Sequence, residues 1–370
     1  MSLHVVCISV LIIGLFFCIF PSRASACTAI ALKAENGDVV TGRTMDWRSF
    51  DLMSRILIIP RGQEFTGQTP DGTPGLQWKG KYGVVGIDML HQDVLADGLN
   101  EKGLSVSVLY LPDFAEFPSF NPVLARNTIG PLNVITYLLT TTTTVEEARE
   151  AIEGVNVVSV VEPAIHIPPP IHWIITDHSG KHIVIEYLKG KLVIHDAPLG
   201  VMTNAPSYDW HMTNLRNYIN LSPTSLPGRK IEDLDFKPLG GGSGMIGLPG
   251  DFTPPSRFVR AVAFTQTARP TVDGPETLYE GFRILDNFNV PVTAAEGAAT
   301  LEPSDVKRSA TLWTVLNDHN NLTVSYHTQH NRRVRQVNFS DIDFDTLDTM
   351  LHIPLDKESK QDIEMITIPQ

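Results

Sequence analysis

The chain has 370 residues, of which 42% are apolar and 19% are charged, and its formal net charge is −12. This composition is typical of a globular protein with enough apolar material for a core. An acidic chain without a Lys/Arg cluster is a poor candidate for binding nucleic acid, whereas no class of small-molecule substrate is excluded.

The first 26 residues are typical of an export signal. Residues 5–20 form an almost unbroken apolar run, Pro21 interrupts it, and Ala24-Ser25-Ala26 fits the small-residue pattern of a peptidase site. The run is shorter than the roughly 20 residues that a membrane span needs. We therefore predict cleavage after Ala26 and a secreted or periplasmic chain without stable membrane insertion, in which residues 27–370 form a single catalytic domain.

Cys27 would then be the first residue and the sole cysteine of the mature chain, because Cys7 and Cys18 lie in the signal. Three interpretations compete: a small buried residue, the acylated cysteine of a surface lipoprotein, and an N-terminal nucleophile. A terminal cysteine carries its own α-amine, with a pKa of about 7.7–8.0, which can serve as general base. Ala24 is an imperfect match to a lipoprotein signal, and the strand-forming "TAIALKA" is unlike a flexible tether.

A β-hairpin is predicted directly after Cys27. Residues 28–33 and 39–44 flank Asn36-Gly37, and Asn-Gly is the strongest short hairpin signal. The second strand returns towards Cys27, so Arg43 would lie near the thiol and Asp46 near the α-amine or an incoming amide. A surface Arg–Asp ion pair is the alternative.

Further along, the chain alternates helices and antiparallel strands, which favours an α+β fold. Glycine- and proline-rich residues 238–258 are expected to form an extended loop without regular structure. The other expected elements are helices at 133–140, 145–153 (with Thr144 as N-cap and Gly154 at the end) and 275–287, a three-stranded meander at 171–197, and a hairpin turning at 318–321.

Several long motifs, in order, resemble the choloylglycine hydrolase and penicillin V acylase family of N-terminal-nucleophile (Ntn) hydrolases, which cleave linear amides. The opening motif is "CTAIALKAENGDVVTGRTMDW", and the likeness continues through "ADGLNEKGLSVSVLYLP", "HWIITDHSGKHIVIEY", "GVMTNAPSYDWHMTNL" and "LPGDFTPPSRFVRA". The resemblance implies a four-layer αββα sandwich, in which two antiparallel sheets lie between helical layers.

The resemblance also implies roles for single residues. Cys27 matches the nucleophile, and Arg43 and Asp46 match the polar pair beside it. Asn204 matches an asparagine whose side-chain amide helps to form the oxyanion hole, and Arg257 matches a second active-site arginine. The backbone N–H of Tyr110 would be the other oxyanion donor.

The sequence indicates the substrate less clearly than it indicates the catalytic residues. Tyr110 stands where penicillin V acylases commonly have tyrosine and bile salt hydrolases asparagine, and Trp47 would suit aryl or long acyl chains. These residues favour a penicillin V acylase-like enzyme, with conjugated bile salts and N-acyl homoserine lactones as alternatives. The family's chemistry needs no metal or cofactor, and His172, His178 and His182 lack a recognisable ligand spacing. The family also implies a homotetramer in which residues 211–241 reach across subunits; a plain surface loop is the alternative.

Overall fold

The computed structural model describes residues 27–47, 51–291, 294 and 310–369. The predicted export signal, residues 1–26, lies outside the described residues. None of the helices within the described part of the chain has the length and apolar character that crossing a membrane requires.

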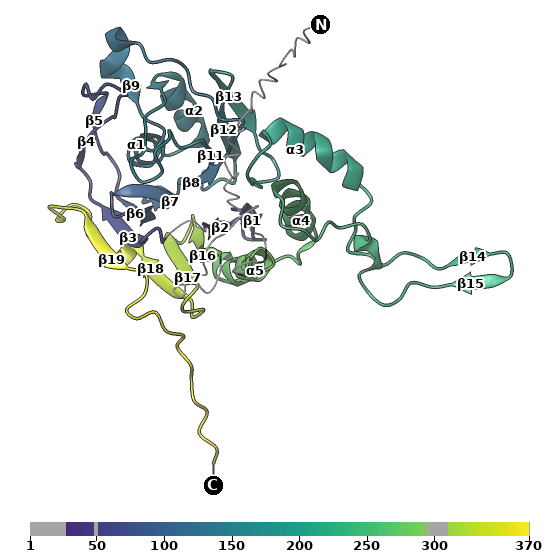
Figure 1. The fold of residues 1–370 in the computed structure, drawn as a ribbon. Helices are drawn as coiled ribbons and strands as arrows, with labels where there is room; N and C mark the ends of the chain where they lie inside the picture. The colour runs from purple at the N-terminus through teal and green to yellow at the C-terminus, as the bar shows by residue number, and fades with distance from the viewer. Residues whose placement is uncertain (1–26, 48–50, 292–293, 295–309, 370) are drawn as a thin grey trace, which may run out of the picture.

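Two sheets, antiparallel throughout, form the centre of the molecule (Figure 1). The smaller sheet has the strand order β1 (Ala29–Lys33), β2 (Val39–Asp46), β16 (Thr311–Asp318), β17 (Thr323–Thr328) and β18 (Arg335–Asn338). The larger has the order β13 (Lys191–Asp196), β12 (His182–Leu188), β11 (Ile171–Thr176), β8 (Ser105–Tyr110), β7 (Val94–Asn100), β6 (Val84–Met89), β3 (Arg55–Ile59) and β19 (Leu351–Pro354).

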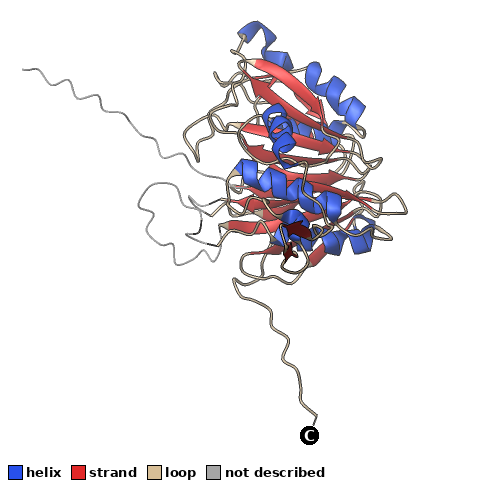
Figure 2. Cartoon of the chain, turned by 90° about the vertical axis from the view of Figure 1, so that its right-hand side faces the viewer, coloured by secondary structure: helices blue, strands red, loops and turns tan. Residues whose placement is uncertain are grey.

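Helices cover the outer face of each sheet (Figure 2). Helices α1 (Asn133–Thr141) and α2 (Val145–Glu153) pack on the eight-stranded sheet, and α4 (Pro254–Thr267) and α5 (Gly274–Asp286) pack on the five-stranded sheet. Strand alternation explains the layers: on β8, Val106 and Val108 join the core beneath α1 and α2, whereas Leu109 joins the core between the sheets. The predicted α+β sandwich is confirmed.

Shorter elements connect these layers or extend from them. They are β4 (Glu64–Thr66), β5 (Gln77–Lys79), η1 (Pro122–Asn127), β9 (Thr128–Ile129), β10 (Asn156–Val157), α3 (Tyr208–Asn214), η2 (Leu215–Tyr218), β14 (Arg229–Ile231), β15 (Leu234–Phe236), η3 (Ser243–Met245) and η4 (Phe339–Asp341).

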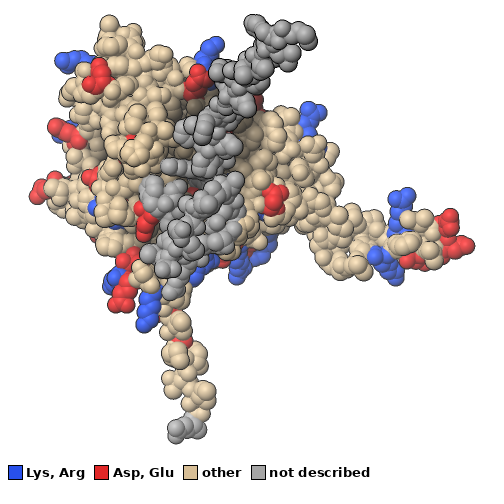
Figure 3. Space-filling view, viewed as in Figure 1, with Lys and Arg blue, Asp and Glu red and all other residues tan. Residues whose placement is uncertain are grey.

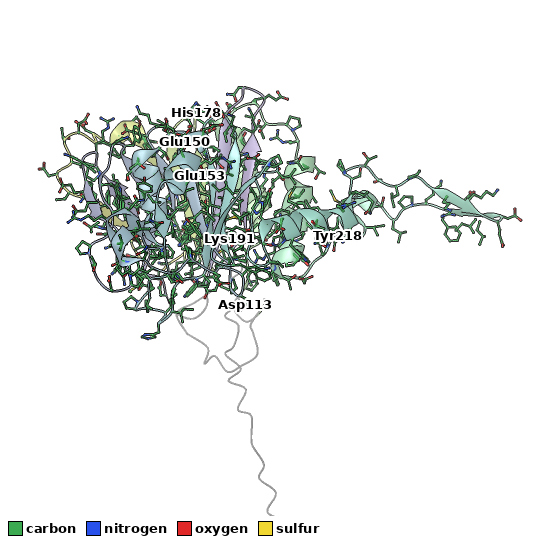
Figure 4. The ribbon with its side chains drawn as sticks, turned by 90° about the horizontal axis from the view of Figure 1, so that it is seen from above. Asp113, Glu150, Glu153, His178, Lys191 and Tyr218 are labelled. Carbon is green, nitrogen blue, oxygen red and sulfur yellow. The ribbon has the colours of Figure 1, made fainter. Side chains whose placement is uncertain are left out.

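Residues 222–244, which contain β14 and β15, project far from the body as an arm (Figure 1). In Figure 4, Tyr218 marks the place where the chain leaves α3 and η2 for this arm. Figure 3 shows basic and acidic side chains interspersed on the visible face, and both signs of charge on the arm.

The local predictions are confirmed at two hairpins, one three-stranded meander and three helices. Strands β1 and β2 flank the Asn36-Gly37 turn, β11 to β13 form the meander, and β16 and β17 form the C-terminal hairpin. In α2, the Thr144 side chain accepts a hydrogen bond from the Glu147 N–H, and Gly154 is the C-cap. Helices α1 and α5 lie where they were expected.

The prediction for residues 238–258 was wrong at its end. Helix α4 begins at Pro254, so Arg257 is a helical residue and not a loop residue. Two prolines open the helix, and proline suits a first turn because its fixed φ is helical and no N–H there needs a partner. The sequence analysis also missed α3 and the β14–β15 hairpin.

Candidate active site

The register of the first hairpin places Cys27 and Arg43 on one face. Ala29 pairs with Arg43, so Cys27 lies opposite Met45, and all four side chains point to the same side of the sheet. That side faces the eight-stranded sheet. Arg43 Nη2 donates to Cys27 Sγ at 2.9 Å, and both residues are buried.

Arg43 spans the space between the two sheets. Its Nη1 donates to the carbonyl oxygens of Val108 on β8 and, at 3.1 Å, Ala96 on β7. Its guanidinium also lies 5.3 Å from the ring centroid of Trp313. These contacts fix the cation against the sulfur, where it stabilises negative charge on that atom.

Asp46 belongs to the opposite face of β2, together with Thr44. Its carboxylate accepts hydrogen bonds from the hydroxyl groups of Thr44, at 3.1 Å, and Thr311. Burial raises the pKa of Asp46 to about 6, although these hydroxyls and the charges of Arg257 and Arg43 oppose the shift. Asp46 is therefore a buried acid whose charge depends on pH.

Arg257 connects Cys27 to Asn204. From the first turns of α4 it donates to the Cys27 carbonyl oxygen, to Thr28 Oγ1 at 2.8 Å and to Asn204 Oδ1 at 2.7 Å. Burial lowers the pKa of Arg257 to about 10, against the effect of Asp46. Because Asn204 Oδ1 is held by the arginine, its Nδ2 is turned towards β8.

The amide of Asn204 and the main chain of Tyr110 meet at the end of β8. Asn204 Nδ2 donates to the Tyr110 carbonyl oxygen at 2.7 Å. Leu111 N–H donates to Pro170 on the β11 side, so the Tyr110 N–H lies on the other edge of β8, the edge that carries the Val108 carbonyl bound by Arg43. The Tyr110 N–H and the Asn204 amide therefore both lie at this end of β8.

The structure brings together all seven residues singled out from the sequence: Cys27, Arg43, Asp46, Trp47, Tyr110, Asn204 and Arg257. It also reveals supporting residues that the sequence analysis did not find. His172 Nε2 bonds the Thr203 carbonyl at 2.8 Å, and His211 Nε2 bonds that of Asn204 at 2.9 Å. His172 is 31 residues from Thr203 and His211 is seven from Asn204, and neither spacing belongs to a recognisable local motif.

An apolar pocket opens beside Cys27, with a volume of about 70 Å³. We call it the acyl pocket; it is lined by Cys27, Arg43, Met45, Trp47, Leu52, Met89, Leu90, Ala96, Val108, Leu109, Tyr110, Leu132, Glu162, Ile165, Pro169 and Ile171. The rings of Trp47 and Tyr110 meet edge to face, with centroids 5.9 Å apart. The pocket can receive an apolar group joined to a carbonyl that lies at the sulfur.

One cluster of potential metal ligands occurs among the described residues, formed by Asp88, Asp93 and His352. Arg55 already pairs with both carboxylates, at 2.6 and 3.3 Å. His172 bonds Glu186, and His182 bonds Thr176. In this cluster, and at His172 and His182, these partners are other side chains of the protein.

The family model described as linear amide C–N hydrolases, choloylglycine hydrolase family, matches residues 27–352. The chain belongs to the choloylglycine hydrolase family. Two curated relatives carry different names. A bile salt hydrolase/transferase of Clostridium perfringens is 36% identical over 70% of this chain and 78% of its own, and a penicillin V acylase of Pectobacterium atrosepticum is 27% identical over 86% and 82%.

The fold agrees with this assignment. A crystal structure of a variant conjugated bile acid hydrolase from Clostridium perfringens superposes with a TM-score of 0.79 and 28% identity, covering 92% of this chain and 100% of that one. The family match begins at Cys27, the residue at which the sequence predicts that the mature chain starts. The protein is a hydrolase of carbon–nitrogen bonds in linear amides.

Proposed function

We propose that the protein is an exported cysteine amidase whose nucleophile is created by removal of residues 1–26. The observation that carries the proposal is the position of Cys27, with Sγ in the acyl pocket and 2.9 Å from Arg43. Cleavage after Ala26 would turn the Cys27 amide nitrogen into an α-amine on the same residue as the thiol.

In the proposed reaction, the Cys27 sulfur attacks the substrate carbonyl carbon as the α-amine takes the thiol proton. Asn204 Nδ2 and the Tyr110 N–H stabilise the oxyanion. The ammonium then protonates the leaving nitrogen, the C–N bond breaks, and a thioester remains. Water adds to the thioester with the amine again as base, which releases the acid and restores the thiol.

The acyl pocket supports a compact aryl or alkyl acyl group, as in penicillin V. Apart from Arg43 and Glu162 its lining is uncharged and mostly apolar, which suits an aryl or alkyl group. Trp47 and Tyr110 provide flat walls for an aryl group. An N-acyl homoserine lactone with an alkyl chain would meet the same walls.

Conjugated bile salts are the second candidate, because the bile salt hydrolase/transferase relative is more similar in sequence than the penicillin V acylase. Met45 and Met89 line the pocket, and methionine adapts readily to larger groups.

The nucleophile is tested with processed wild type and the Cys27→Ala and Cys27→Ser variants on penicillin V, glycocholate, taurocholate and an acyl homoserine lactone. We expect hydrolysis of at least one substrate to fall about 10³-fold or more with an unchanged circular dichroism spectrum. One residue added before Cys27 should abolish activity as well, because it removes the α-amine. Full turnover by Cys27→Ala contradicts the proposal.

Intact mass separates the enzyme from the lipoprotein alternative. The amidase requires an unmodified Cys27 at the start of the secreted chain, whereas a lipoprotein would carry acyl chains of several hundred daltons on that residue. If the secreted form is acylated at Cys27 and inactive, the proposal that the protein is an amidase is wrong.

A further inference from the structure

The acyl pocket contains one carboxylate, Glu162, among otherwise mostly apolar lining residues. Glu162 lies in the segment between β10 and β11, and it is 5% exposed. Burying a carboxylate in apolar surroundings is costly unless it is hydrogen-bonded, so its presence in a pocket for an acyl group needs a reason.

Part of that reason is local structure. Glu162 Oε1 accepts hydrogen bonds from the Ala164 N–H at 3.1 Å and from Gln92 Nε2 at 3.4 Å. The backbone of Glu162 is bonded to Ile167 and His166 in the same loop. One oxygen of the carboxylate is thus used to shape the loop and to join it to the turn between β6 and β7.

The second carboxylate oxygen of Glu162, Oε2, has different surroundings. Among hydrogen bonds of the described residues, none is made by Glu162 Oε2, yet this atom is not sealed from solvent. Because the residue is otherwise buried and lines the acyl pocket, a group bound in the pocket is the ligand best placed to reach Oε2. An acyl group that carries a hydrogen-bond donor can supply the missing partner.

The kind of donor follows from the neighbouring charges. Arg43 lines the same pocket, so a cationic acyl group would face its guanidinium group. An anionic acyl group would face Glu162. A neutral hydroxyl group satisfies both constraints, since it donates to the carboxylate and adds no charge.

We propose that Glu162 is a specificity-determining residue that selects acyl groups bearing a hydroxyl over the same groups without one. This inference rests on the proposed function and names the substrate class within it. A hydrogen bond to a buried charged group favours the hydroxylated substrate by about 10- to 100-fold in kcat/KM.

The test uses amides that share one leaving amine and differ in the acyl group: phenylacetyl, 3-hydroxyphenylacetyl and 4-hydroxyphenylacetyl. Wild type should prefer one of the hydroxylated amides over the plain one by about 10- to 100-fold. In Glu162→Leu this ratio should fall to about 1.

Two further variants separate selectivity from loop structure. Glu162→Gln keeps an oxygen that accepts from the Ala164 N–H but loses the negative charge, so the ratio should fall several-fold. This variant tests the inference independently of whether Glu162→Leu folds. Gln92→Ala removes the contact between the loops but keeps the carboxylate, so the ratio should remain that of wild type.

A ratio near 1 in wild type for both hydroxylated amides, or a ratio unchanged in Glu162→Leu and Glu162→Gln, overturns the inference while the proposed function stands. Absence of Cys27-dependent hydrolysis of every amide, including those of the substrate panel above, overturns the proposed function and the inference with it.

Discussion

Arg43 and Asp46 are three positions apart on β2 and lie on opposite faces of the strand. Arg43 shares the inward face with Cys27 Sγ, whereas Asp46 shares the other face with Thr44. The alternation of the strand thus places the cation beside the sulfur and keeps the carboxylate on the opposite face.

Asn204 has one oxygen held by Arg257 and one nitrogen directed to β8. Replacing it by alanine removes a side-chain donor to the oxyanion, so kcat should fall about 10²- to 10³-fold. Asn217→Ala, an exposed asparagine of η2, is the matched control and should leave kcat unchanged. Equal kcat in the two variants would remove Asn204 from the oxyanion hole.

Asp46 makes stability depend on pH in a defined direction. Its pKa is about 6 in the folded chain and 3.8 as an ordinary aspartate, so the folded state holds the extra proton between these values. The free energy of unfolding should therefore decrease as pH rises from about 4 to 6, by up to about 3 kcal/mol. Urea unfolding of wild type and Asp46→Asn measures this difference.

That comparison is made on chains with one residue added before Cys27, so that no α-ammonium charge lies at this position. The difference between the two proteins should change across pH 4–6 and be constant above pH 7. Parallel pH profiles, or a wild type that gains stability over Asp46→Asn as pH rises, would show that Asp46 is ionised throughout.

At the level of elements, β2 is fixed by close packing against β16. A Cβ added at Gly42 would lie 2.6 Å from Leu316 Cγ and 2.7 Å from the Val315 carbonyl oxygen. Glycine is needed here because the neighbouring strand and α5 leave no space for a methyl group.

Gly42→Ala should lower the free energy of unfolding by about 1–3 kcal/mol and reduce activity, because a shift of β2 moves Arg43 away from Sγ. Gly154→Ala is the control: the added Cβ would meet only ordinary contacts of 3.4 Å or more, and its φ is helical. Denaturant unfolding and kcat/KM are measured for both. A fully active, fully stable Gly42→Ala would show that β2 can move without affecting the site.

The elements differ in how far sequence could predict them. The hairpin of β1 and β2 follows from Asn36-Gly37 and a period of two, so the approach of Arg43 to Cys27 was predictable from local pattern. Asn204 and Arg257 lie far along the chain, and only the resemblance to a family pointed to them. Glu162 was not found, because its loop has no periodic pattern and its proximity to the pocket depends on the fold.

For the molecule as a whole, the arm is the least integrated part. Its apolar side chains are at least half exposed: Leu226, Ile231, Leu234, Phe236 and Leu239. A protruding hairpin with exposed apolar groups is typical of a contact between subunits. The homotetramer expected from the resemblance remains a prediction.

The arm can be removed cleanly because its ends meet: Ser222 N–H donates to the Gly244 carbonyl oxygen at 3.0 Å, and Leu226 N–H donates to Ser243 Oγ at 2.8 Å. Replacing residues 227–242 by a short Gly-Ser link should yield a folded monomer. Light scattering coupled to size exclusion measures the mass.

As a control, changing the tip residues Glu232 and Asp233 to Asn-Gly keeps the apolar side chains and should preserve the tetramer. Asn and Gly suit this turn because Glu232 has a φ of 53°. A tetramer that survives deletion of the arm would assign assembly to another surface.

The burial of Cys27, with 2% of its surface exposed, has a consequence for the order of events in the cell. A peptidase binds an extended chain in its cleft, whereas in the folded protein Cys27 is buried and the strand that follows it is paired within the sheet. Under the proposed function, maturation must therefore come before folding is complete. A chain that folded before export would then remain an uncleaved precursor without amidase activity.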